Sequence, residues 1–191
     1  MKKLPLFLTI SRVVLAPVSI LFVYLDWLGW PYLALLGIAA LSDYYDGVLA
    51  RKYGVATAGL RQFDSIADTI FFVAVLIGMN IAYPQVVHDY LGGIVAVIGL
   101  EAFRYVVDYL KFGRGASYHA YSAKIFGFFL LIATVTIMGF GVASPYFTVA
   151  LLSGIVSEVE GLFISLILPS WRYDIKHVGI AVKIRNDYLN S

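Results

Sequence analysis

The chain has 191 residues, of which 61% are hydrophobic and only 14% are charged, and its mean hydropathy is +0.85. A soluble domain carries roughly 45–50% apolar and about 25% charged residues, so this composition excludes an ordinary soluble domain. The apolar residues are spread over nearly the whole length, which also excludes a single anchor on a soluble domain. We therefore expect one membrane domain over residues 1–191. Because the chain has no cysteine, disulfides, thiolate nucleophiles and cysteine metal sites are excluded.

The N-terminus, Met1-Lys2-Lys3, is basic and then turns apolar, which resembles the start of a signal peptide. Arg12 interrupts the apolar run, and no small-residue cleavage site follows it. We therefore expect an uncleaved first segment. It is predicted to start as an interfacial helix over residues 4–12 and to bend into a membrane span near Pro17.

Six stretches of the chain are apolar enough to cross a membrane. A transmembrane helix needs about 20 mostly apolar residues to cross a hydrocarbon layer about 30 Å thick. Short links with turn-forming residues separate the stretches. The predicted fold class is all-α, a polytopic membrane bundle of six transmembrane helices with an N-terminal interfacial helix. The stretches are residues 13–25, 32–53, 63–83, 90–112, 120–142 and 146–168.

Lysine and arginine are confined to one side of this predicted bundle, apart from Arg104 inside the fourth stretch. The three links on the opposite side carry none. This asymmetry is the positive-inside pattern of cytoplasmic loops. We therefore expect an integral multi-pass protein with cytoplasmic N- and C-termini, in a prokaryotic cell membrane. The basic residues on this side are Lys2, Lys3, Arg12, Arg51, Lys52, Arg61, Lys111, Arg114, Lys124, Arg172, Lys176, Lys183 and Arg185.

Four aspartates fall within or at the ends of the second and third stretches. Asp43 and Asp46 are three residues apart and share one helix face, and Asp64 and Asp68, four apart, share another. Ionisable groups within membrane spans are costly and are functional candidates by default. The link between the two helices is short and basic, so we expect the two pairs to face each other near the cytoplasmic surface.

Four carboxylates packed together repel one another, and divalent cations relieve the repulsion. Oxygen donors without cysteine or a nearby histidine favour Mg²⁺, Mn²⁺ or Ca²⁺ over zinc. Two such cations about 3.5–4 Å apart can hold a phosphate diester between them. Gly47 and Ala50 share the face of Asp43 and Asp46 and leave room for a ligand, although small residues also pack helices together in lipid. Arg51, one step further on, suits a phosphate.

Two segments resemble the signature of the CDP-alcohol phosphotransferase family: Asp43-Tyr44-Tyr45-Asp46-Gly47-Val48-Leu49-Ala50-Arg51, followed by Asp64-Ser65-Ile66-Ala67-Asp68. The family pattern is D-x2-D-G-x2-A-R-x8-G-x3-D-x3-D, and seven of its eight fixed positions are met with the family's spacing. The departure is Leu60, which stands where the pattern has a glycine, and Gly59 precedes it. The chain length is similar to that of phosphatidylglycerophosphate synthases.

The resemblance implies a metal-dependent enzyme of phospholipid biosynthesis, which transfers a phosphatidyl group from CDP-diacylglycerol to the hydroxyl of a small alcohol and releases CMP. It implies two divalent cations, Mg²⁺ or Mn²⁺, and a homodimer. It also implies Asp68 as the general base for the acceptor hydroxyl. The implied residues are Asp43, Asp46, Asp64 and Asp68 for the cations, and Gly47, Ala50, Arg51 and Gly59 for the nucleotide.

The segment of residues 111–119 leads into Lys124 and lies on the same predicted membrane side as the aspartates. Arg114, Ser117 and Lys124 suit an acceptor phosphate, and basic residues of this region bind phosphorylated acceptors in similar family members. Plain positive-inside topology explains the basic residues equally well. Glycerol 3-phosphate is the acceptor we expect, and inositol phosphate, serine or an archaeal lipid donor are left open.

Two interpretations from other classes stay open. A divalent-cation transporter predicts carboxylates near the bilayer midplane and inverted repeats, whereas these carboxylates cluster near one surface and no repeat is evident. A non-catalytic family member would keep the site but only bind nucleotide or metal, and Leu60 leaves this open. We expect CDP-diacylglycerol, a small alcohol and membrane lipids as partners, and no nucleic acid.

Overall fold

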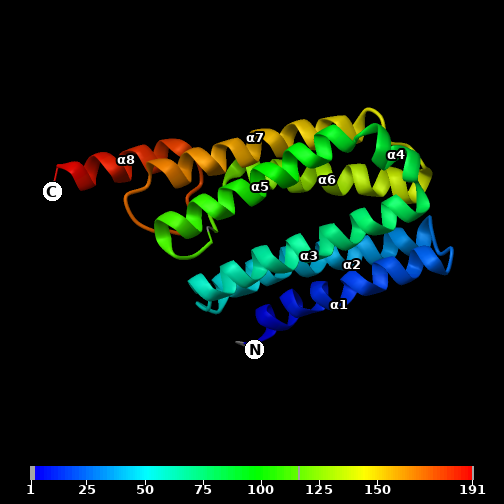
Figure 1. Cartoon of the computed structure of the whole chain (residues 1–191). Coiled ribbons are helices and arrows are strands. Elements are labelled where there is room, and N and C mark those ends of the chain that lie inside the picture. The colour runs from blue at the N-terminus through cyan, green and yellow to red at the C-terminus, as the bar shows by residue number, and fades with distance from the viewer. Residues whose placement is uncertain (1–2, 116, 191) are drawn as a thin grey trace. The chain divides into compact units, whose positions relative to one another are not determined.

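The computed structural model describes residues 3–115 and 117–190, and these residues form helices and loops with no strand. Lys2, one of the basic residues on the predicted cytoplasmic side, lies outside the described residues. Prolines stand in the first turns of α1 and α2, a position that favours the start of a helix. The helices are α1 (Leu4–Tyr24), α2 (Trp30–Lys52), α3 (Ala58–Ala82), α4 (Pro84–Asp89), α5 (Leu91–Phe112), α6 (Tyr121–Phe140), α7 (Tyr146–Ile167) and α8 (Val178–Leu189), as Figure 1 shows.

The first compact unit contains α1, α2, α3 and α4 together with Thr134–Ala143, which is the C-terminal part of α6 and the residues that follow it. Within it α1 packs against both α2 and α3 (Figure 1). The N–H of Gly29, before α2, donates to the carbonyl of Met138 in α6 at 3.1 Å. Side chains on α1 are therefore placed beside both helices that carry the aspartates.

The second unit contains α5, the N-terminal part of α6, α7 and α8. Within it α7 packs against α5 and against α8. α5 ends at Gly113, whose left-handed backbone (φ 69°) is the conformation that commonly ends a helix. A small buried core joins the 118–120 segment, the end of α7 and the C-terminal tail through Tyr118, Ala120, Ile164, Leu168, Ile175 and Ala181.

Five helices in the described part of the chain are long and apolar enough to span a membrane: α1, α2, α3, α6 and α7. The protein is an integral membrane protein, and the expected all-helical class is confirmed. The fourth expected span, residues 90–112, forms α5, but this helix carries Glu101, Arg104, Asp108 and Lys111 and is not among the five. The count of six is therefore not confirmed.

The predicted N-terminal interfacial helix does not form a separate element. Residues 4–12 belong to one unbroken helix, α1, and Pro17 lies inside it. The physical reason is that a break within an apolar stretch of 21 residues would leave backbone N–H and C=O groups without partners in lipid. Whether residues 1–191 act as one domain stays a prediction.

Candidate metal and nucleotide site

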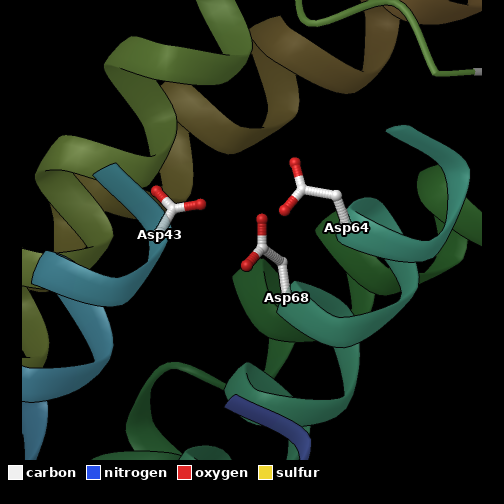
Figure 2. A group of neighbouring side chains, drawn as sticks. All are labelled: Asp43, Asp64 and Asp68. Carbon is white, nitrogen blue, oxygen red and sulfur yellow. The ribbon is translucent and has the colours of Figure 1, made fainter. Parts of the chain in front are cut away.

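Three of the four aspartates converge as a possible metal site. Asp43 projects from α2, and Asp64 and Asp68 project from α3, with their carboxylates turned toward a common space (Figure 2). One carboxylate oxygen from each lies within 4.8 Å of those of the other two. At the start of α3, Thr57 caps the helix by accepting a hydrogen bond from the N–H of Leu60 at 3.3 Å. Asp43 of the first pair and both aspartates of the second therefore lie together, while their role in metal binding stays a prediction.

Asp46, the fourth aspartate, is held by a hydroxyl. Its side chain is only 5% exposed, and its Oδ2 lies 3.0 Å from Thr9 Oγ1 on α1. Thr9 itself is 1% exposed, and its hydroxyl also lies 3.1 Å from the carbonyl oxygen of Pro5. A buried carboxylate needs such donors, because leaving its oxygens without hydrogen bonds costs free energy. Thr9 therefore fixes the orientation of Asp46.

Arg12 on α1 contacts all four aspartates, and its side chain is 2% exposed. Its Nη1 donates to Asp43 Oδ1 at 2.7 Å and also to Asp68 Oδ1. Its Nη2 donates to Asp46 Oδ2 and to Asp64 Oδ1. Each terminal nitrogen thus joins one carboxylate of α2 to one of α3, so a single guanidinium holds the four acidic side chains together.

The donor set fits a hard divalent cation. Every side chain in the group offers carboxylate oxygen, and Mg²⁺, Mn²⁺ and Ca²⁺ are bound by oxygen. The exposure of the side chains is uneven: Asp43 and Asp68 are 54% and 39% exposed, whereas Asp46 and Asp64 are 5% and 11% exposed. One side of the cluster is therefore open to a soluble or headgroup-sized ligand.

A small hollow adjoins the cluster, and two of the four residues predicted to bind nucleotide line it. Gly47 and Ala50 belong to its wall. A Cβ added at Gly47 would meet only Arg51 Nη1, at 3.6 Å, so packing within the protein does not require glycine there. The small side chain is consistent with space left for a ligand. The full lining is Thr9, Asp46, Gly47, Ala50, Leu60, Arg61 and Asp64.

The position where the family pattern expects glycine also lies at this hollow, but it is filled by Leu60. Gly59 is not part of the lining, and nothing lies within 4 Å of where its Cβ would be. Arg51 is exposed at the end of α2 and lies outside the lining, whereas Arg61, which the site prediction did not include, belongs to it. Arg61 lies near Gly47 in space but not in the sequence motif, so the motif alone gives no signal for it.

The predicted acceptor residues all belong to the second unit. Arg114 is exposed, and its guanidinium carbon lies 4.6 Å from the ring centre of Trp171 in the tail. Lys124 is also exposed. Ser117, in contrast, is 3% exposed, and its Oγ lies 3.2 Å from His119 Nε2. Arg114 and Lys124 are therefore available to a ligand, while Ser117 is already engaged inside the protein.

The geometry above agrees with a family comparison made over most of the chain. A family model described as CDP-alcohol phosphatidyltransferase matches residues 2–164. The chain belongs to the CDP-alcohol phosphatidyltransferase family. The matched residues include both aspartate pairs, the hollow beside them and the 111–124 segment. The resemblance found in the sequence is therefore confirmed.

Curated relatives of this CDP-alcohol phosphatidyltransferase family member carry the name CDP-diacylglycerol–glycerol-3-phosphate 3-phosphatidyltransferase. The protein from Rickettsia typhi is 42% identical over 79 residues, which are 40% of this chain and 44% of the relative. The one from Haemophilus influenzae is 38% identical over 76 residues, 39% of this chain and 41% of the relative. The one from Escherichia coli is 33% identical over 76 residues, 39% and 42% of the two chains. Each match spans less than half of the relative's length, and no solved structure matched significantly.

Two partly buried polar contacts in this family member give Glu158 and Glu160 a structural role. Arg104 Nε on α5 donates to Glu158 Oε2 on α7 at 2.8 Å. Gly161 allows this approach, because a Cβ there would lie 2.9 Å from Arg104 Cδ. Glu160 Oε1 accepts from the N–H of Val178 at 3.1 Å, at the start of α8. Both glutamates therefore hold helices of the second unit together.

Tyr118 completes this polar interior. Its hydroxyl lies 3.0 Å from Ser165 Oγ and donates to Asp108 Oδ1 at 3.4 Å. Asp108 is fully buried, and its Oδ2 lies 3.7 Å from Arg104 Nη1. Burial raises the pKa of the Tyr118 hydroxyl, because the phenolate would lose its hydration. Tyr118 therefore stays a neutral donor, and the sequence carried no signal for this role.

Proposed function

We propose that this family member transfers the phosphatidyl group of CDP-diacylglycerol to the hydroxyl of a small alcohol and releases CMP. The observation that carries the proposal is the convergence of Asp43, Asp64 and Asp68, at the family's spacing, beside a hollow lined by Gly47 and Ala50. A cluster of oxygen ligands for divalent cations suits a diphosphate, and the small side chains of Gly47 and Ala50 beside it let a ligand approach the backbone.

We infer that Asp43, Asp46, Asp64 and Asp68 hold two divalent cations, Mg²⁺ or Mn²⁺. When bound, such cations supply the positive charge that stabilises phosphorus under attack and the departing CMP. Support comes from the all-oxygen donor set and from the placement of one aspartate pair on each of two helices. Thr9 orients Asp46 for this role through its hydroxyl.

The remaining chemistry falls to the protein's own side chains. Gly47 and Ala50 leave room for the nucleotide, Gly59 and Arg51 are assigned to the same ligand, and Arg51 binds a phosphate oxygen. Asp68 accepts the proton of the acceptor hydroxyl. The acceptor oxygen forms a bond to the phosphorus that carries diacylglycerol, and the bond from that phosphorus to the oxygen of CMP breaks.

The choice of Asp68 as the base is supported by its accessibility. Its side chain is 39% exposed, so an acceptor hydroxyl can reach it, whereas Asp46 and Asp64 are largely covered. Asp43 is also exposed, at 54%, and the preference for Asp68 over Asp43 follows the family resemblance. Substitution of each therefore gives a direct comparison of their roles.

Glycerol 3-phosphate is the acceptor that we propose. The relatives' names specify this substrate for those proteins. In this chain Arg114 and Lys124 present exposed positive charge that suits the acceptor's phosphate, and Ser117 supports the loop between them. Inositol phosphate carries the same phosphate chemistry and is the alternative acceptor.

The membrane context is part of the same proposal. The basic residues on one side of the chain support cytoplasmic N- and C-termini and a cytoplasmic active site. A prokaryotic cell membrane agrees with the bacterial relatives. We also propose a homodimer, as the family resemblance implies.

The proposal is tested by incubating purified protein in detergent with CDP-diacylglycerol, Mg²⁺ or Mn²⁺ and a panel of acceptors, and measuring CMP. Release of CMP with glycerol 3-phosphate only would support the proposed acceptor, and release with inositol phosphate only would replace it. No release with any acceptor, from protein that still binds divalent cation and CDP, would favour a non-catalytic family member.

A further inference from the structure

Arg12 is a buried cation that contacts all four aspartates of the cluster, and it lies on a helix that carries none of them. It lies on α1, whereas the aspartates lie on α2 and α3. Burying a guanidinium within an apolar helix is costly unless its charge is paired. Here the pairing is extensive, because its Nη1 and Nη2 together contact one oxygen of each of four carboxylates.

Arg12 contacts the same four carboxylates that the proposed cations would need. Nη1 joins Asp43 to Asp68, and Nη2 joins Asp46 to Asp64, so each nitrogen links the same two helices that a bound cation would link. We propose that Arg12 is an exchangeable counter-ion, which holds the carboxylates together before divalent cations bind and competes with those cations for the same oxygens. This inference rests on the proposed metal site.

The charges favour exchange over joint occupancy. Four ionised carboxylates carry a formal charge of about −4, and two divalent cations neutralise it without any help from Arg12. With both cations bound, Arg12 at its observed position would lie beside added positive charge, and like charges at short range repel. Arg12 therefore must give up carboxylate contacts as the site fills.

A fixed structural role for Arg12 predicts the opposite consequences. If Arg12 were a permanent part of the site, its removal would loosen the carboxylates and weaken cation binding. If it competes, its removal tightens cation binding while it destabilises the cation-free protein, because four facing carboxylates then lack their counter-ion. The sign of the change in cation affinity separates the two roles.

The experiment measures binding of Mn²⁺ alone to purified protein in detergent by electron paramagnetic resonance, for wild type and Arg12→Gln. Lys52→Gln is the matched control. Lys52 is exposed at the end of α2, so this substitution also removes one positive charge but does not touch the cluster. We expect Arg12→Gln to lower the Kd for Mn²⁺ at least about tenfold, and Lys52→Gln to change it far less.

Thermal denaturation supplies the second measurement. In EDTA the midpoint of Arg12→Gln should fall below that of wild type, and saturating Mn²⁺ should raise it by more than it raises wild type, because a tighter ligand stabilises more. Arg12→Lys is the second variant, in case Arg12→Gln does not fold in EDTA. Lysine keeps the positive charge but has one terminal nitrogen where arginine has two, so it contacts fewer carboxylates. It should bind Mn²⁺ more tightly than wild type by a smaller factor.

An unchanged or raised Kd for Mn²⁺ in both Arg12 variants would overturn the exchange. This outcome differs from failure of the proposed metal site, in which wild type itself would bind no Mn²⁺ at the cluster. Asp64→Asn tests whether Mn²⁺ binds at the cluster. Loss of this carboxylate must weaken Mn²⁺ binding there, whatever the role of Arg12.

Discussion

Thr9 Oγ1 on α1 lies 3.0 Å from Asp46 Oδ2 on α2, and both side chains are buried. Because this hydroxyl orients a proposed metal ligand, Thr9→Val should weaken Mn²⁺ binding about tenfold or more, with a parallel loss of activity. Mn²⁺ titration and the CMP assay measure the two effects. Thr9→Ser keeps the hydroxyl and should retain most of both. Equal affinities in Thr9→Val and Thr9→Ser would show that the contact does not matter to the site.

Asp68→Asn tests the proposed base. The substitution keeps the size of the side chain but removes its capacity to accept a proton, so CMP release should fall at least about 100-fold. Asp26→Asn is the control, because Asp26 is an exposed aspartate at the far end of α1 whose positive φ of 56° asparagine tolerates. Circular dichroism should show the same helix content in both. Near-normal activity of Asp68→Asn would transfer the role of base to another group, with Asp43 the next to test.

Leu60 tests the departure from the family pattern. Its side chain lines the hollow beside Gly47 and Ala50, so a smaller residue should give the nucleotide more room. We expect Leu60→Ala to lower the KM for CDP-diacylglycerol several-fold with little change in kcat. Leu60→Gly should do the same at a stability cost of about 1 kcal/mol, because glycine disfavours the helix. A raised KM in both variants would mean that the leucine contacts the donor favourably.

The Arg104–Glu158 pair tests the account of the second unit. Both side chains are nearly covered, at 13% and 12% exposure, so Glu158→Gln leaves a buried guanidinium without its partner's charge. The loss should be about 3 kcal/mol of unfolding free energy, measured by denaturant titration in detergent. Asp187→Asn, on the exposed face of α8, removes a negative charge and should change stability little. Similar stabilities for the two variants would show that the pair contributes nothing.

The sequence was sufficient for the parts of the site that depend on helical spacing. Asp43 and Asp46 at i, i+3, and Asp64 and Asp68 at i, i+4, fix their shared faces before any packing is known. The all-helical membrane class likewise follows from composition alone. These features are local, so a pattern along the chain is enough to predict them.

The features that the sequence did not reveal depend on packing between distant segments. Arg12 lies 31 residues from Asp43 and 56 from Asp68, and no pattern along the chain places it among four carboxylates. The same holds for Glu158, whose partner Arg104 is 54 residues away. α5 shows the limit of composition: Arg104 and Asp108 on this helix pair inside the protein, so hydropathy alone does not classify it.

The most direct test of the proposed activity compares two products of one reaction. Wild-type protein is incubated with CDP-diacylglycerol, glycerol 3-phosphate and Mg²⁺, and CMP and the lipid product are quantified together by mass spectrometry, with EDTA as the metal-free arm. We predict equal amounts of CMP and phosphatidylglycerophosphate with Mg²⁺, and neither in EDTA. CMP without the new lipid would indicate hydrolysis instead of transfer, and full activity in EDTA would contradict the role assigned to the four aspartates.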